Sequence, residues 1–348
     1  MIKRIVLSVS VALLGATGVL QPVLAARPAA TVNLVGAGST FDLPFFTKAF
    51  DVYCKQKRIC VNYQAIGSGA GVQQITAKTV DFGASDVPMN PATELPAARK
   101  AGGPVLQVPI ALGGVAIAYN IPGVKRGLHL TGPVIADMYM GITKYWDAKP
   151  IKKLNPKVKL PHLRVTPVYR SDSSGTSYIF TSYLAKVSDP WQGQVGVGKL
   201  PQWPAGVGGK GNPGVAATVQ NTPGAVGYVE LAYVLQNHMK DAMLQNRSGT
   251  WVFPTTKSVA AAASKFPHVS ATQFSIVDAK GAASYPICGY SWVLMFKKQT
   301  DASKGKALKA LMQWLATKGQ TYAATLDYVA LPKKVQLLAQ KELKTVST

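Results

Sequence analysis

The sequence predicts an α/β protein with two domains. Short apolar runs alternate with helical patterns along most of the chain, and this alternation is typical of α/β folds. The 348 residues are enough for two domains of ordinary size. The chain contains no internal repeat. We therefore expect globular domains in which strands and helices follow one another in turn.

The first 25 residues have the pattern of a secretory signal peptide. Lys3 and Arg4 give a positive start, an apolar stretch runs from Ile5 to Leu20, and small residues precede a cleavage site after Ala25. The apolar stretch is too short, and too often interrupted by Gly and Pro, for a stable membrane span. No cysteine lies near the cleavage site. We expect a soluble, exported protein without a lipid anchor.

The part of the chain after this leader predicts strands and helices in alternation. VNLVGAG predicts a strand and LPFFTKAFDVYCK a helix, and CVNYQAIGS and GVQQITAKTV repeat that order. DFGASDVPM carries a short buried strand that ends at Asp86, and PIALGGVAIAYN is strongly strand-like. The predicted ranges are 32–38, 43–55, 60–68, 71–80, 81–89 and 109–120.

The chain after residue 120 predicts four helices, one long strand and one long loop. The segment 188–224 is rich in Gly, Pro and Trp, and its GK pair lacks the Ser or Thr that a P-loop requires, so we predict irregular loop there. The apolar stretch AVGYVELAYVL follows it. YPICGYSWVLMF at 285–296 predicts a strand. The helical patterns cover residues 133–141, 177–186, 303–317 and 333–343.

The cysteines and histidines predict one possible disulfide and no metal site. Cys54 and Cys60 lie six positions apart in an exported chain, so they either form a disulfide or stay as two thiols. Cys288 lies in an apolar stretch, which indicates a buried thiol. The four histidines are isolated and have no ligand spacing.

The chain is strongly basic, with a formal net charge of +23. The Lys and Arg residues are scattered rather than clustered with aromatic residues, which argues against nucleic acid as a partner. The densest run, KQKR at 55–58, we interpret as a solvated loop. Two explanations of the charge remain open, namely steering of a small anion and adaptation to an acidic exterior.

Three short segments combine a turn, hydroxyl side chains and the start of a helix. They are GAGSTF (36–41), GSGAG (67–71) and RSDSSGTS (170–177). The first N–H groups of a helix have no intrahelical acceptor, and the helix dipole adds positive potential there, so such segments bind phosphate or sulfate readily. One such segment alone is usually a helix cap. Three together, one of them with an Arg, favour an oxyanion site.

Six motifs carry a resemblance to a known family. GAGSTF, NYQAIGSGAGVQQI, DFGASD, RSDSSGTSYIFTSYLAKV, GGKGN and PGAVGYVE, in this order, resemble the periplasmic phosphate-binding proteins of the phosphate-specific ABC transporter. The resemblance extends from about Val32 to about Pro332. It implies the type II periplasmic binding protein-like fold, with two α/β lobes, two crossing hinge strands and a ligand cleft between the lobes.

The resemblance also implies where the lobes divide and what the protein does. The crossing strands are 109–120 and 285–297; residues 26–114 with 288–348 form the first lobe, and residues 115–287 form the second. The implied function is capture of inorganic phosphate in the periplasm and its delivery to the permease and ATPase complex of the transporter. A monomer is expected, with no cofactor and no catalysis.

The family's ligand residues match positions in this sequence. In GAGSTF and GSGAG they are Thr40, Phe41 and Ser68, and in DFGASD the match is Asp86. Asp172 matches the carboxylate that pairs with the family's Arg and orients it. In RSDSSGT the matching ligands are Arg170, Ser174, Gly175 and Thr176.

The sequence departs from the family at Asp42, where the family often has Pro or another uncharged residue. A carboxylate here either repels a bound anion or faces water and complements the dipole of the helix that follows. We expect the second.

Asp86 predicts which oxyanion is bound. A carboxylate beside an anion is unfavourable unless the anion brings a proton, which phosphate keeps at neutral pH and sulfate lacks. A site built around a required donor rejects an analogue without it by about 10⁴-fold. This argues against sulfate and molybdate as ligands. A phosphatase would need metal ligands or a nearby base, and a basic adhesin would need repeats, and neither is visible.

Overall fold

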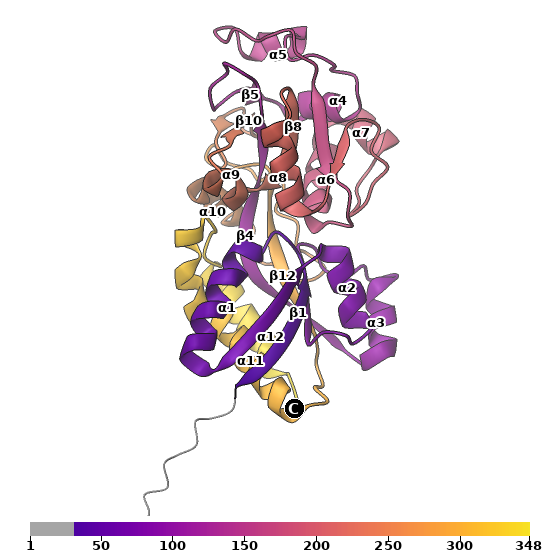
Figure 1. Cartoon of the computed structure of the whole chain (residues 1–348), viewed down its shortest axis with the longest axis vertical. Helices are drawn as coiled ribbons and strands as arrows, with labels where there is room; N and C mark the ends of the chain where they lie inside the picture. The colour runs from indigo at the N-terminus through magenta and orange to yellow at the C-terminus, as the bar shows by residue number, and fades with distance from the viewer. Residues whose placement is uncertain (1–30) are drawn as a thin grey trace, which may run out of the picture. The chain divides into compact units, whose positions relative to one another are not determined.

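The computed structural model describes residues 31–348, so the predicted signal peptide, residues 1–25, lies outside the described residues. The described part is mixed α/β and contains a nine-stranded sheet and a small three-stranded sheet (Figure 1). Within residues 31–348, no helix is both long and apolar enough to cross a membrane.

The strands of the large sheet form two parallel groups joined by antiparallel strands. The strand order is β2-β1-β3-β12-β4-β8-β6-β7, and β9 also pairs with β4. β1 is parallel to β2 and β3, and β6 is parallel to β7 and β8. The strands are β1 (Val32–Gly38), β2 (Ile59–Ala65), β3 (Phe82–Ser85), β4 (Val105–Tyr119), β5 (His129–Leu130), β6 (Thr166–Arg170), β7 (Val207–Gly209), β8 (Ala225–Glu230), β9 (Lys240–Asp241), β10 (Met243–Gln245), β11 (Trp251–Val252) and β12 (Cys288–Phe296).

The helices pack on these strands. In Figure 1, α1 with α11 and α12 lies on one side of the first strand group, and α2 with α3 lies on the other. The helices are α1 (Leu43–Lys57), α2 (Ser68–Thr76), α3 (Glu94–Gly102), α4 (Gly132–Tyr139), α5 (Lys149–Leu154), α6 (Gly175–Val187), α7 (Asp189–Gln194), α8 (Gly211–Asn221), α9 (Leu231–Gln236), α10 (Thr256–Ala263), α11 (Ala302–Leu315) and α12 (Lys333–Lys344), with 3-10 helices η1 (Lys318–Tyr322) and η2 (Ala324–Leu326).

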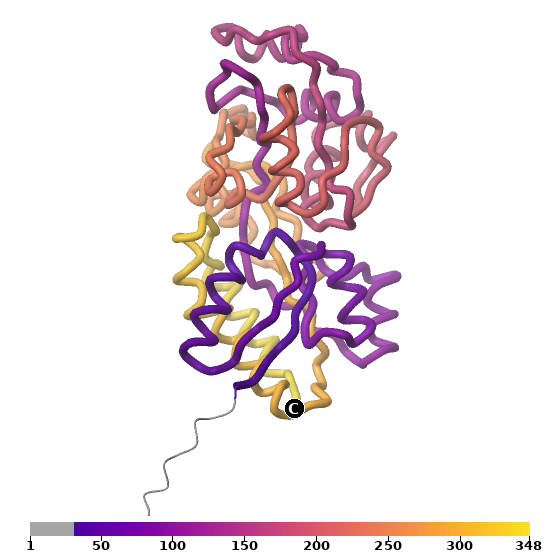
Figure 2. Tube along the Cα trace, viewed as in Figure 1, coloured from indigo at the N-terminus to yellow at the C-terminus, as the bar shows by residue number. Residues whose placement is uncertain are grey.

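The long strand β4 connects the two groups of strands. Its first part, Val105–Gly114, pairs antiparallel with β12, and its last part, Val115–Tyr119, pairs antiparallel with β8. Both β4 and β12 are buried along nearly their whole length, which explains their continuous apolar sequence. The chain returns through β12 to the first group, so the C-terminal helices lie beside the N-terminal strands (Figure 2).

The prediction of irregular loop over 188–224 is wrong. This segment forms α7, β7 and α8. Val215, Ala216 and Val219 of α8 are buried in a cluster with residues of β6 and β8, and this packing outweighs the high Gly and Pro content. A Cβ at Gly209 would lie 2.7 Å from the Val215 nitrogen, so glycine is needed where β7 meets α8.

Two smaller predictions also need correction. The second predicted helix, 71–80, begins earlier and ends earlier, because the glycine-rich GSGAG segment is itself part of α2. The KQKR run is exposed but not a loop, since Lys55 and Lys57 occupy the last turn of α1. Positive charges at a helix C-terminus interact favourably with the helix dipole.

Cys54 of α1 and Cys60 of β2 form a disulfide, with their Cα atoms 4.4 Å apart, and Cys288 is a buried free thiol. The bond ties the end of α1 to the start of β2. It closes a short loop, since the two cysteines are six positions apart.

We predict that replacing both Cys54 and Cys60 by Ser lowers the free energy of unfolding by about 2 kcal/mol, the loop-closure entropy expected for a loop of this length. Urea unfolding of the wild type and of the double variant measures the difference. A mild reductant should destabilise the wild type and leave the double variant unchanged. Equal unfolding curves for both proteins would contradict this role of the disulfide.

Candidate anion-binding site

The carboxyl ends of the parallel strands from both groups come together at one place. Thr40 follows β1, Ser68 follows β2, Asp86 follows β3 and Arg170 ends β6. In open α/β sheets, ligands bind at the carboxyl ends of the strands, where connecting loops leave helix N-termini and side chains free to converge. The sheet therefore positions these four residues from distant parts of the sequence.

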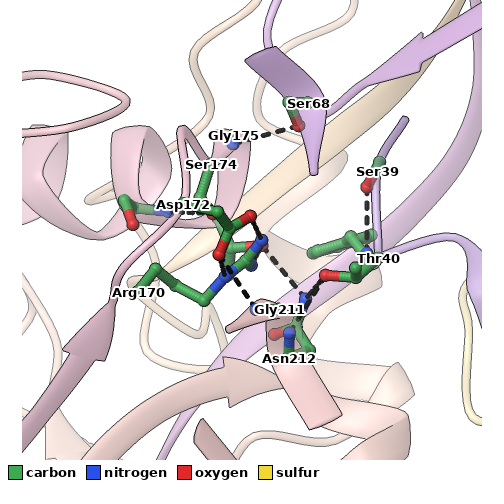
Figure 3. Close-up of polar contacts among 12 residues, drawn as sticks. Ser39, Thr40, Ser68, Arg170, Asp172, Ser174, Gly175, Gly211 and Asn212 are labelled. Atoms are coloured by element: carbon green, nitrogen blue, oxygen red, sulfur yellow. Dashed lines mark hydrogen bonds and ion pairs between the residues drawn. The ribbon is translucent and has the colours of Figure 1, made fainter. Parts of the chain in front are cut away.

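Hydrogen bonds join the two strand groups directly. The Oγ of Ser68 accepts from the Gly175 N–H at 3.0 Å and from the Asp86 N–H at 3.3 Å. The Oγ1 of Thr40 accepts from the backbone N–H and from the side-chain amide of Asn212, at 3.0 and 2.9 Å (Figure 3). The starts of α2, α6 and α8 therefore meet the segment before α1.

The start of α6 requires glycine at position 175. A Cβ there would lie 2.6 Å from the Asp86 Cβ and 2.8 Å from the Ser68 Oγ. Ser174 caps the helix, since its Oγ accepts from the Ser177 N–H at 3.1 Å. Because the first N–H groups of a helix have no intrahelical acceptor, the Thr176 amide at this end is suited to bind an anion.

Arg170 is held by Asp172 in a two-point ion pair. Its Nε donates to Oδ1 at 2.8 Å and its Nη2 donates to Oδ2 at 2.5 Å, and its side chain is only 1% exposed. Asp172 Oδ1 also accepts from the Gly211 N–H at 2.9 Å. Burial alone would raise the pKa of the Asp172 carboxyl, but the hydrogen bonds and charge of Arg170 hold that pKa below its usual range.

Asp86 lies at the centre of the cluster and accepts three side-chain hydroxyls. Its Oδ1 accepts from Ser39 and, at 3.0 Å, from Ser291, and its Oδ2 accepts from Thr176 at 3.0 Å. Burial raises the pKa of this carboxyl, although the hydroxyl of Ser39 and the charge of Arg170 act to lower it. The same Thr176 hydroxyl oxygen accepts from Arg170 Nη1 at 3.3 Å.

Comparison with known proteins places the chain in a family. Residues 25–318 match the PBP superfamily domain. The phosphate-binding protein PstS of Xylella fastidiosa is 43% identical over 305 residues, which cover 87% of this chain and 82% of that protein. The phosphate-binding protein PstS of Pasteurella multocida is 42% identical over 316 residues, covering 90% of each chain.

The chain belongs to the PstS family of phosphate-binding proteins.

A solved structure supports the fold of this PstS family member. The chain superimposes with a TM-score of 0.74 and 19% identity on the high-affinity periplasmic phosphate-binding protein PfluDING, solved with phosphate bound, covering 89% of this chain and 93% of that one. The predicted fold class, periplasmic binding protein-like α/β, is confirmed. The relatives are named as binding proteins.

The structure brings together most of the residues that the sequence predicts as ligands. The N–H of Phe41 donates to Ser39 Oγ at 2.9 Å, and the ring of Phe41 lies in the hydrophobic core. Asp172 is paired with Arg170, as expected for a residue that orients the Arg. The residues brought into one buried cluster are Thr40, Ser68, Asp86, Arg170, Ser174, Gly175 and Thr176.

The expectation that Asp42 faces water is wrong. Its side chain is fully buried, does not cap α1, and has its Oδ2 2.6 Å from the Oγ of Ser291. The start of α1 points toward β12 rather than toward solvent, so this carboxyl lies next to Asp86 instead of complementing the helix dipole in water.

Sequence reasoning missed three polar residues of the cluster, Ser39, Asn212 and Ser291, and one backbone amide, that of Gly211. Gly211 and Asn212 lie in the GGKGN motif, but the prediction of loop at 188–224 concealed the helix start that aims them at Thr40 and Asp172. Ser291 is on a buried strand, and the sequence gives no sign that its hydroxyl lies between two carboxyls.

Within residues 31–348, no group of three or more His, Cys, Asp or Glu side chains could hold a metal ion.

We predict that Asp172→Asn destabilises the protein by about 3 kcal/mol, because it leaves the buried Arg170 without its anion. Urea unfolding at neutral pH in a phosphate-free buffer measures this change. Asp51→Asn, which breaks the exposed pair with Lys55, is the control and should cost less than about 1 kcal/mol.

The difference between wild type and Asp172→Asn should also depend on pH. Since the folded-state pKa of Asp172 is depressed, its stabilisation is present above the unfolded-state pKa and is lost as the pH falls through the folded-state pKa. The gap in unfolding free energy should therefore shrink below about pH 4. A gap that is constant with pH would contradict the ion-pair explanation.

Proposed function

We propose that the protein captures inorganic phosphate at this cluster and delivers it to a phosphate ABC transporter for import, without catalysis. Membership of the PstS family supports the function, and the names of its relatives supply the ligand. The observation that carries the proposal is the convergence of Ser68, Thr176, Arg170 and Asp86 from four separate elements. The proposed ligand residues are Thr40, Phe41, Ser68, Asp86, Arg170, Ser174, Gly175 and Thr176.

Fixed dipoles would supply much of the attraction for phosphate. The hydroxyls of Thr40, Ser68 and Thr176 lie together with amides at helix starts, and in the complex these groups would donate to the phosphate oxygens. Arg170 adds a charge-assisted contact, and Asp172 holds the guanidinium in place before the ligand arrives. Such preorganisation lowers the entropic cost of binding.

Asp86 would select for a protonated oxyanion. An ionised carboxylate has about four lone-pair sites, and Asp86 already accepts three hydroxyls, which leaves capacity for one further donor. The hydroxyl of phosphate can fill that site. Sulfate has no proton, so its oxygen would face the carboxylate as a second acceptor, and unpaired buried acceptors are costly.

The same proposal includes two lobes that close on the ligand. Residues 26–114 with 288–348 would form one lobe and residues 115–287 the other, with β4 and β12 as the crossing strands. The pairing of β4 with β12 and then with β8 supports this division. Hinge closure about two strands is a common response to a bound ligand. The transporter's permease and ATPase complex would recognise the closed form of the monomer.

The leader pattern supports export to the periplasm, followed by cleavage after Ala25.

The alternative function from another class is an enzyme that hydrolyses phosphate esters. A chromogenic phosphate ester incubated with the purified protein distinguishes the two, because a binding protein releases no chromophore.

We predict that Arg170→Ala lowers phosphate affinity by at least about 10-fold, because losing one charge-assisted contact costs more than about 1.4 kcal/mol. Isothermal titration calorimetry with phosphate measures the change. Lys55→Ala, on an exposed helix end, is the control. Wild-type affinity for Arg170→Ala would rule out this site.

We predict that Asp86→Asn reduces the preference for phosphate over sulfate. The amide can donate a hydrogen bond to sulfate, so the penalty for an anion without a proton disappears. Competition titrations with both anions, on the wild type and the variant, give the selectivity ratio. An unchanged ratio would remove Asp86 as the selecting residue and leave the binding function standing.

A further inference from the structure

A second buried carboxyl, Asp42, is connected to Asp86 through one hydroxyl. Ser291 Oγ lies 2.6 Å from Asp42 Oδ2 and 3.0 Å from Asp86 Oδ1. Asp42 is fully buried and Asp86 is 2% exposed, so neither carboxyl is in contact with bulk water. Ser291 thus bridges the two acids.

One hydroxyl cannot serve both carboxylates. Ser291 has a single proton to donate, although its oxygen can also accept. If both acids are ionised, one of the two short contacts lacks a hydrogen and two like charges lie buried together. If Asp42 carries a proton, Asp42 can donate to Ser291, and Ser291 can then donate to Asp86. The mirror arrangement, with the proton on Asp86, satisfies both contacts as well, so one of the two acids must be protonated.

The surroundings decide which acid holds the proton. Asp86 accepts three hydroxyls and feels the charge of Arg170, and all of these favour its ionised form. Asp42 Oδ1, in contrast, has no hydrogen-bond partner among residues 31–348. Burial first, and then the charge of Asp86, raise the pKa of Asp42 well above its usual range. The first proton therefore belongs to Asp42.

No cation is among the groups in residues 31–348 that act on Asp42. Ser291 faces it from β12, Ser39 from the end of β1, and Asp86 from the end of β3. The other titratable groups with which it interacts electrostatically are Tyr63, Glu230, Tyr233 and Tyr328, from β2, β8, α9 and the segment after η2. Only the Ser291 and Ser39 hydroxyls favour the ionised form of Asp42, and their effect is smaller than the effects of burial and of the charge of Asp86.

We infer that Asp42 is a positioning residue: it keeps a proton and, through Ser291, directs a hydrogen bond onto Asp86, which holds Asp86 as the ionised acceptor for the phosphate hydroxyl. This inference rests on the proposed phosphate function. Ionisation of Asp42 at higher pH turns the Ser291 proton away from Asp86 and adds a negative charge beside the anion site. Phosphate affinity then falls as the pH rises through the pKa of Asp42.

The test is phosphate affinity as a function of pH for the wild type and Asp42→Asn. The Asn amide is uncharged and donates permanently to Ser291, so it mimics the protonated acid. Calorimetry from about pH 5 to about pH 9 spans the range in which a raised carboxyl pKa titrates. The ratio of the two dissociation constants cancels the titration of phosphate itself. Asp42→Asn should match the wild type at low pH and bind about 10-fold more tightly at high pH, the effect of one pKa unit of coupling.

Two further variants show whether the effect depends on the Ser291 bridge or on any buried carboxyl near the site. Ser291→Ala removes the bridging hydroxyl and should narrow the preference for phosphate over sulfate by about 10-fold, since Asp86 loses a charge-assisted hydrogen bond and takes up a proton more easily. Glu230→Gln is the matched control: Glu230 is equally buried but has no contact with Ser291, and its variant should keep the alkaline loss of affinity.

Infrared spectroscopy detects the protonation state of the Asp42 carboxyl without a measurement of phosphate binding. In the Glu230→Gln background, the band of a neutral buried carboxyl should be present at low pH, disappear on alkalinisation, and be absent after Asp42→Asn. Circular dichroism and thermal melting show whether each variant is folded.

The outcomes distinguish the two proposals. If the wild type binds phosphate but Asp42→Asn has the same pH profile, or retains the neutral-carboxyl band, the role of Asp42 is overturned and the phosphate function stands. If the wild type binds no phosphate at any pH, the function is overturned and the role of Asp42 with it.

Discussion

Charge balance around Arg170 is the constraint on which the candidate site depends. Arg170 is the only buried Lys or Arg in residues 31–348, and its side chain is held at two points by Asp172. A buried charge is stable only when it is paired and hydrogen-bonded, so Asp172 both neutralises the guanidinium and fixes its direction. The pair leaves Nη1 of the guanidinium directed at the Thr176 hydroxyl, next to Asp86, where the proposed anion site lies.

The acids near this charge follow the same constraint. Asp86 is stabilised by hydroxyls and by Arg170. Asp42 and Glu230 are buried with no cation beside them among residues 31–348, and desolvation raises their pKa values strongly. Neutral acids can donate hydrogen bonds and ionised ones can only accept, so the same residue type takes different roles in one cluster. The fold sets these roles by bringing strand ends from distant parts of the chain to one place.

The sequence predicted the regular elements well where apolar periodicity was clear. The strands at β1, β4 and β12 and the helices α1, α6, α11 and α12 lie close to their predicted ranges, because their burial pattern is written in local sequence. The segment 188–224 was misread, since its helix α8 is stabilised by packing on β6 and β8 and not by local propensity. The ligand residues were identified by resemblance. Their partners Asn212 and Ser291 were not, because contacts across more than a hundred positions leave no local pattern. The same limit explains why Asp42 was expected in water.

The most direct test of the central claim is a crystal structure of the protein grown with phosphate. The account predicts one phosphate with oxygens at hydrogen-bond distance from Ser68, Arg170 and Thr176, and with one oxygen beside an Asp86 carboxylate oxygen. A phosphate bound elsewhere, with Arg170 still engaged only by Asp172 and Thr176, would contradict it.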